Sequence, residues 1–258
     1  MMEREEQRDE IRQAVVSSLV GNLARLEEAI EAACRAASRS RDEVELVAVS
    51  KNHPAEALEE AFALGLRLFG ENRVQEFAAK SAELTAETRA AMRVHLIGHL
   101  QSNKAAKAVE VFDGVDSLDS VKLAERLDEA AGRLGKRLPV LLEIKLSAEE
   151  TKAGLAPDSR ELAELLDRLP SLGNLQAQGL MTIAPLDVSG EETRACFRAL
   201  SELRNRLTQA NPALSLPVLS MGMSGDFALA IAEGATRIRV GTALFGPRPG
   251  VARPGYAI

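Results

Sequence analysis

Apolar positions along the chain follow two alternating spacings. From about residue 10 to residue 37 they recur every three or four positions, which predicts one or two leading helices. Beyond that point, short aliphatic and β-branched runs predict eight strands, at residues 44–50, 66–69, 94–97, 114–118, 139–146, 175–183, 217–220 and 237–245. Helical spacing returns between many of them and predicts helices at residues 54–64, 102–111, 120–134, 158–169, 191–209 and 225–233.

This alternation of strands and helices predicts a parallel sheet with right-handed crossovers. Eight such units close a barrel, and the first predicted strand ends in Val-Ser-Lys-Asn-His-Pro, without the glycine-rich loop of a dinucleotide-binding sheet. We therefore expect an α/β fold, a single (β/α)8 TIM-type barrel with one or more leading helices. No linker-like stretch divides the chain, so the expected organisation is a helical extension over residues 1–40, packed on a barrel over residues 41–258.

Charge and composition exclude several classes of function. The 258 residues include 32 basic and 38 acidic side chains, a net charge of −6, which disfavours nucleic acid as a partner. The apolar runs are far shorter than the roughly 20 residues needed to cross a bilayer, so no membrane span is expected. The charged N-terminus does not resemble a secretory signal, and Cys34 and Cys196 do not suggest a disulfide framework. These features predict a cytoplasmic location.

Lys51 is the first candidate for chemistry. The active site of a (β/α)8 barrel lies at the C-terminal ends of its strands, and Lys51 directly follows the first predicted strand. Pro54 then suits the first position of the next helix. A lysine amine at this mouth becomes nucleophilic where burial and nearby cations lower its pKa. The alternative is a strand-end lysine that extends into solvent, and Lys51 alone does not decide between them.

Two loops near the end of the chain predict an anion-binding cup. Gly241 and Thr242 offer backbone N–H groups and a hydroxyl in the last predicted unit, and the loops after strands seven and eight of such barrels commonly bind phosphate. Ser224, next to Met223 in the preceding loop, could cap a helix whose N-terminal N–H groups favour an anion. A tight turn at Gly241 and a simple helix cap at Ser224 are the alternatives.

Arg239 lies two residues before Gly241, so both should be on the same face of the strand and Arg239 should project into the barrel mouth. A guanidinium only donates hydrogen bonds. Facing a pyridine nitrogen, it would keep that nitrogen unprotonated and weaken the ring as an electron sink. An interior ion pair with Glu71 or Glu143 is the alternative.

Weaker candidates for the pocket are Asn72, His95 and Met181, each at or near the end of a predicted strand. His95 and His99 could also be considered as metal ligands. The chain has only three histidines, and no acidic residue stands at a familiar ligand spacing from these two, so no metal site is expected.

Ordered motifs over residues 44–247 resemble those of the pyridoxal phosphate homeostasis proteins, the YggS/PROSC family. The matching stretches are Ala48-Val-Ser-Lys51, Phe69-Gly-Glu-Asn72 with Val74-Gln-Glu76, His95-Leu-Ile-Gly98, Leu100-Gln-Ser-Asn-Lys104, Thr151-Lys-Ala-Gly154, Gly179-Leu-Met181, Leu219-Ser-Met-Gly-Met-Ser224 and Arg239-Val-Gly-Thr-Ala-Leu-Phe-Gly246. The chain departs from the family at Arg73, where relatives often carry an aromatic residue, and at His99, where the position varies or holds proline.

The resemblance implies a barrel like the N-terminal domain of alanine racemase, with Lys51 as the lysine that holds pyridoxal 5′-phosphate (PLP) in a Schiff base. It further implies that Ser224, Gly241 and Thr242 hold the phosphate and that Arg239 faces the pyridine nitrogen. The implied role is intracellular PLP homeostasis: sequestering the cofactor and surrendering it to apo-enzymes or to free amino acids, without robust catalysis.

Two enzymatic alternatives remain open. Alanine racemases use a tyrosine from a second domain as the opposite-face base, whereas this chain ends shortly after its eighth predicted strand and has a single tyrosine, Tyr256. Racemisation would need another base, such as His95. A Schiff-base aldolase on the same barrel would also explain a strand-end lysine beside a phosphate cup. A barrel mouth without a covering domain fits a monomer.

Overall fold

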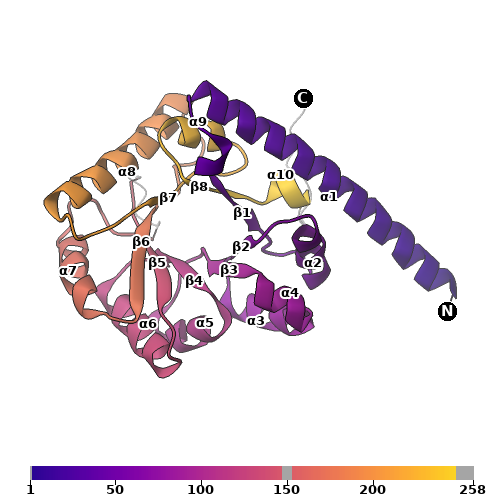
Figure 1. Cartoon of the computed structure of the whole chain (residues 1–258), viewed down its shortest axis with the longest axis horizontal. Helices are drawn as coiled ribbons and strands as arrows, with labels where there is room; N and C mark the ends of the chain where they lie inside the picture. Colours follow the sequence, from indigo (N-terminus) through magenta and orange to yellow (C-terminus); the bar gives the residue numbers. More distant parts are fainter. Residues whose placement is uncertain (1, 147–152, 248–258) are drawn as a thin grey trace.

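The computed structural model describes residues 2–146 and 153–247, and side chains from residue 18 onward. Its eight strands form a closed barrel in sequence order, and every neighbouring pair is parallel (Figure 1). The strands are β1 (Glu45–Val49), β2 (Leu68–Glu71), β3 (Arg93–Leu96), β4 (Gly114–Leu118), β5 (Leu138–Glu143), β6 (Leu175–Met181), β7 (Val218–Ser220) and β8 (Arg237–Val240). The predicted (β/α)8 barrel is confirmed.

Helices surround this barrel. They are α1 (Met2–Ala36), α2 (Ala55–Ala63), α3 (Val74–Glu83), α4 (Ala86–Ala91), α5 (Ala105–Val111), α6 (Val121–Arg133), α7 (Arg160–Arg168), α8 (Gly190–Ala210), α9 (Phe227–Ala232) and α10 (Thr242–Phe245), with short 3-10 turns η1 (Arg41–Glu43), η2 (Ser102–Lys104) and η3 (Leu169–Ser171). Serine caps begin three of the outer helices: the side chains of Ser120, Ser159 and Ser189 accept hydrogen bonds from the third helical N–H of α6, α7 and α8. Within the described residues, no helix is both long and apolar enough to cross a membrane.

Alternation along the strands divides the apolar residues between two layers. In β1, Leu46 and Ala48 belong to the large cluster shared with the surrounding helices. Val47 and Val49 belong instead to a second cluster, together with Leu68 and Ile97. Because successive strand residues point to opposite faces, this second cluster lies inside the barrel.

Helix α1 takes the place on the barrel wall that follows β8. It runs along the outside of the barrel beside α9 and α10, and its N-terminal end projects beyond the barrel (Figure 1). Leu26 and Ile30 bury their side chains in the main core. Asn22 Nδ2 donates a 2.8 Å hydrogen bond to the carbonyl of Leu244 in α10. Within the described residues, β8 is followed by the short α10, and the long helix beside β8 comes from the beginning of the chain.

A network of charged side chains crosses the barrel interior. His95 Nδ1 lies 2.7 Å from Asp116 Oδ1, and Arg237 donates a 3.3 Å hydrogen bond to Asp116 Oδ2. Arg237 also pairs with Glu45 at 2.8 Å. Burial raises the pKa of Asp116, but His95 and Arg237 outweigh burial and hold that pKa below its usual range. Glu45 and Arg237 begin their strands, so the network extends toward the end of the barrel opposite the strand C-termini.

The structure corrects several predicted boundaries. The eighth predicted strand, residues 237–245, ends at Val240 because the chain turns at Gly241 into α10. The leading segment is one helix of 35 residues. Helices α3 and α4 were not among the predicted helices, and α4 buries no side chain, so it leaves no apolar periodicity to detect.

Candidate functional site

The C-terminal ends of the eight parallel strands meet at one mouth, where several predicted site residues converge. Lys51 lies two residues beyond the end of β1 and is half-buried, while Gly241 directly follows β8. These two strands are neighbours, with Ala48 opposite Val240. A Cβ added to Gly241 would lie 3.0 Å from the carbonyl oxygen of Val49, so the Gly241 turn lies close against the end of β1. The lysine turn and the Gly241 turn are thus side by side.

The loops after β7 and β8 are joined by a hydrogen bond. Ser224 Oγ accepts it from the backbone N–H of Ala243 at 3.4 Å. In the part of the chain that the structure describes, the N–H groups of Ser224 and Gly225 have no hydrogen-bond partner. Thr242 is exposed beside them. Free N–H groups, a hydroxyl and glycine backbone together suit an anion such as a phosphate.

Ser224 differs from its predicted role as a helix cap. The N-cap position of α9 is occupied by Asp226, whose carboxylate accepts a 2.5 Å hydrogen bond from the N–H of Met223. Gly222 precedes this turn with φ of +93°, and a Cβ there would lie 2.7 Å from Ala230 Cβ, so the turn requires glycine. The Ser224 hydroxyl is consequently directed to the neighbouring loop.

Arg239 lies on the inner face of β8 and is only 4% exposed. Its guanidinium donates hydrogen bonds of 2.8 and 2.9 Å to Ser220 O and Oγ and of 2.8 Å to Thr182 O. In the described ranges it forms no ion pair, so the alternative of a pair with Glu71 or Glu143 is wrong. Burial lowers the pKa of Arg239. The guanidinium is held across the ends of β6 and β7, which places a fixed cation at the mouth.

The weaker candidates occupy different positions. Asn72 is half-buried after β2, and a Cβ on Gly98 would lie 2.5 Å from its carbonyl oxygen, so that glycine allows the two loops to approach. Met181 is fully buried at the end of β6, and Met223 is half-buried. His95 is buried against Gly114 and engaged with Asp116, the acidic partner that the sequence did not reveal.

A buried ionic cluster beside Lys51 was missed. Glu71, at the end of β2, receives a 2.7 Å hydrogen bond from Ser50 Oγ and a 2.5 Å hydrogen bond from Lys80 Nζ. Burial raises the pKa of Glu71, although Lys80 and Ser50 act in the opposite direction. The detectable signal was the spacing of Glu76 and Lys80, which puts both on one face of a helix. The sequence does not show which strand-end carboxylate these residues contact, because that depends on how the helix packs on the barrel.

Glu143, considered above only as an ion-pair partner of Arg239, is a carboxyl group at the end of β5. It is 8% exposed, and its Oε2 atom has no hydrogen-bond partner among the described residues. Burial, together with the charge of Asp119, raises the pKa of Glu143 to about 7, while Arg239 lowers it in part. A substantial fraction of Glu143 is therefore protonated at neutral pH.

The two positions that depart from the family pattern lie near this mouth. The side chain of Arg73 is exposed before α3. His99 is also exposed, and its Nδ1 lies 2.9 Å from Asp119 Oδ2. Across the described residues, no group of three or more His, Cys, Asp or Glu side chains could hold a metal ion. Cys34 and Cys196 are both buried, and neither forms a disulfide.

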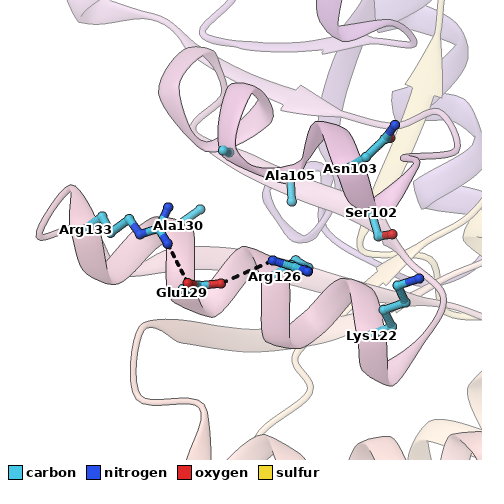
Figure 2. A pocket seen from close by; sticks show the side chains of 9 residues that line it. Ser102, Asn103, Ala105, Lys122, Arg126, Glu129, Ala130 and Arg133 are labelled. Atoms are coloured by element: carbon cyan, nitrogen blue, oxygen red, sulfur yellow. Dashed lines mark hydrogen bonds and ion pairs between the residues drawn. The ribbon is translucent and has the colours of Figure 1, made fainter.

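A groove of about 370 Å³ lies elsewhere, on the outer surface between η2, α5 and α6 (Figure 2). Lys122, Arg126 and Arg133 line it, and Glu129 pairs with both arginines, at 3.6 Å and 2.5 Å. Arg126, Glu129 and Arg133 are exposed and pair with one another, and Lys122 is exposed beside them. None of the predicted cofactor-binding residues lines it.

Two stretches of interest lie outside the described residues. Thr151 and Lys152, the first half of one family-like motif, are among them. Tyr256, the tyrosine considered above in relation to racemases, is another.

Comparisons with known proteins show the family to which this chain belongs. Residues 22–249 match the family described as alanine racemase, N-terminal domain. Pyridoxal phosphate homeostasis proteins of Aquifex aeolicus and Pseudomonas aeruginosa are 41% and 43% identical to this chain, covering 88% and 90% of it and 96% and 97% of their own lengths. The structure of PipY from Synechococcus elongatus with PLP bound is 48% identical, covers 88% of this chain and all of its own, and superposes with a TM-score of 0.76.

More distant structures share the fold alone. Alanine racemase of Clostridium difficile is 15% identical and superposes with a TM-score of 0.67, covering 91% of this chain and 58% of its own. The chain therefore belongs to the alanine racemase N-terminal domain family and, within it, to the pyridoxal phosphate homeostasis proteins.

Proposed function

We propose that this protein binds PLP at the barrel mouth, covalently through Lys51, and that it holds and releases the cofactor instead of using it for rapid turnover. The observation that carries this proposal is the juxtaposition of the Lys51 turn with the Gly241 turn, next to a cup whose two loops are joined by the Ser224–Ala243 hydrogen bond. When bound, PLP supplies an aldehyde that forms a reversible Schiff base with a lysine amine.

The residues at the mouth fit the other parts of the cofactor. The N–H groups of Ser224 and Gly225 have no hydrogen-bond partner among the described residues. Together with the Thr242 hydroxyl and the Gly241 backbone, they suit a phosphate dianion. Arg239 is held rigidly by backbone carbonyls and is a suitable donor toward the pyridine nitrogen. Such a donor keeps that nitrogen unprotonated, which disfavours reactions that need a strong electron sink.

A role in homeostasis is favoured over racemisation by the state of His95. This residue is the histidine that could serve as a replacement base, but it is 4% exposed and its Nδ1 is engaged with Asp116. Relatives that match this chain over nearly their whole length are named pyridoxal phosphate homeostasis proteins. We further propose that the recipients are apo forms of PLP-dependent enzymes and free amino acids, and that the protein acts as a monomer in the cytoplasm.

Transfer of the cofactor to an apo-enzyme tests this function. The protein is loaded with PLP, freed of excess cofactor and mixed with an apo-aminotransferase, and aminotransferase activity is followed with time. We expect activity to return as PLP leaves the protein. Lys51→Ala, treated identically, should restore little activity, whereas Lys107→Ala, which alters an exposed lysine on α5, should behave like wild type.

A parallel assay with enantiopure L-alanine separates the carrier from a racemase. If the protein is a carrier, L-alanine should racemise no faster with the loaded protein than with free PLP. Racemisation at typical enzymic rates, about 1 s⁻¹ or faster, would contradict it. Failure of the loaded protein to reactivate any apo-enzyme would contradict delivery.

A further inference from the structure

The backbone on both sides of Lys51 is held by charged side chains of β2 and α3. On one side, Lys80 Nζ donates a 3.0 Å hydrogen bond to the carbonyl of Ser50, and Ser50 Oγ donates to Glu71 at 2.7 Å. On the other side, the N–H of Asn52 donates a 2.6 Å hydrogen bond to Glu76 Oε1. The residue between these two attachments is Lys51.

Lys80 connects both attachments. Its ammonium lies 2.5 Å from Glu71 Oε1 and 3.5 Å from Glu76 Oε1, in addition to its bond with Ser50 O. Its side chain is 6% exposed although it belongs to an outer helix. A buried lysine with three oxygen partners has little freedom to move. Lys80 therefore couples the end of β1 to the end of β2 and to α3.

The turn that Lys80 supports is an unusual one. Asn52 has φ of +63°, a left-handed conformation that most non-glycine residues seldom adopt but that asparagine tolerates. The bond from its N–H to Glu76 provides part of this support. If the turn relaxed, the side chain of the preceding Lys51 would no longer leave the strand in a fixed direction.

We propose that Lys80 is a positioning residue for Lys51: together with Glu71 and Glu76 it fixes the backbone around Lys51, so that the lysine amine is presented to the bound cofactor in one orientation. The proposal rests on the proposed function, in which Lys51 is the site of covalent attachment. Lys80 acts through the backbone around Lys51 and does not itself touch the cofactor. Its effect is on covalent capture, because a reaction between two bound groups depends steeply on their alignment.

Two ligands separate positioning from general damage to the mouth. PLP needs both the phosphate cup and a correctly placed Lys51 amine, whereas pyridoxine 5′-phosphate lacks the aldehyde and reports the cup alone. For Lys80→Met we expect the rate of covalent capture of PLP to fall at least about tenfold. The dissociation constant for pyridoxine 5′-phosphate should change less than about twofold, since the cup loops lie after β7 and β8. The matched control is Lys107→Met, which replaces an exposed lysine on α5.

A second variant guards against misfolding. Lys80→Met leaves Glu71 buried without its cation, so Glu71→Gln/Lys80→Met, which removes both charges, is measured beside it. We expect slow capture and normal pyridoxine 5′-phosphate binding in this variant also. Lys80→Arg, which keeps a cation, should recover part of the capture rate.

Three results would overturn the proposal. Capture of PLP at the wild-type rate by a folded Lys80→Met or double variant would show that Lys80 does not position Lys51. A parallel loss of pyridoxine 5′-phosphate binding would show that Lys80 only maintains the mouth as a whole. Failure of wild type itself to capture PLP covalently would overturn both this proposal and the proposed function, and only that result involves the unmodified protein.

Discussion

At the scale of single residues, buried charges inside this barrel differ in how completely they are paired. Asp116 has His95 on one oxygen and Arg237 on the other, and its pKa lies below its usual range. Glu143 has an oxygen without a partner among the described residues, and its pKa is raised to about 7. The ionised form is thus stabilised in the first case and disfavoured in the second.

Glu143→Gln should make stability less dependent on pH. A carboxyl group whose pKa is higher in the folded than in the unfolded state stabilises the fold below its unfolded pKa and loses that contribution as pH rises through about 7. The neutral glutamine cannot ionise. The free energy of unfolding of Glu143→Gln, relative to that of wild type, should therefore increase between pH 5 and pH 8, by roughly 3 kcal/mol at most.

Urea unfolding of both proteins at several pH values measures this difference. An equal stability difference between Glu143→Gln and wild type at pH 5 and at pH 8 would show that Glu143 does not titrate as described.

Some site residues could be located from sequence and others could not. Lys51 was predicted at the mouth because it follows a predicted strand, and Gly241 because it lies in the last unit, whose loop commonly binds phosphate; in a parallel barrel the C-terminal ends of all strands share one face. The clustering of Glu71 with Lys80 could not be predicted, because pattern does not reveal which charges of different elements meet. For the same reason Arg239 was considered for an ion pair, whereas it donates to oxygens of Ser220 and Thr182.

At the scale of elements, α1 packs against α10, which begins at the candidate cup. It packs beside α10, the helix that begins at Thr242, and is tied to it by the bond from Asn22 to Leu244. Arg39, just beyond α1, donates hydrogen bonds to the carbonyls of Ile231 and Ala235. The first helix of the chain is thereby attached to the last two units of the barrel.

Ile30→Ala should destabilise the whole barrel, because the Ile30 side chain of α1 is fully buried in the main core. Loss of such a side chain and the cavity that it leaves typically cost about 2–5 kcal/mol. Glu28→Ala, at an exposed position of the same helix, should change stability by less than about 0.5 kcal/mol.

Chemical denaturation of these two variants tests the role of α1. A cost below about 1 kcal/mol for Ile30→Ala would mean that α1 does not form part of the folded barrel.

Element boundaries were predicted best where apolar periodicity is strong. α6 and α8 begin at serine caps and bury regular faces, and both were predicted to within one residue or two. The run Thr242-Ala-Leu-Phe was predicted as strand, because a helix of four residues is too short to show helical periodicity. Sequence pattern thus located the eighth unit and misassigned its second half.

At the scale of the whole molecule, closure of the barrel brings distant parts of the chain together. Lys51 and Gly241 are separated by most of the sequence, yet they follow adjacent strands because β1 pairs with β8. The count of eight units was enough to predict this closure. PipY from Synechococcus elongatus, whose structure contains PLP, superposes on this fold with a TM-score of 0.76.

Spectra of the protein mixed with PLP show whether Lys51 carries the cofactor. We expect wild type and Lys107→Ala to develop a visible absorbance band, and borohydride reduction to fix the cofactor to the peptide that contains Lys51. Lys51→Ala should show neither the band nor the modified peptide. A band that persists in Lys51→Ala, or reduction that labels a different lysine, would mean that Lys51 is not the site of attachment.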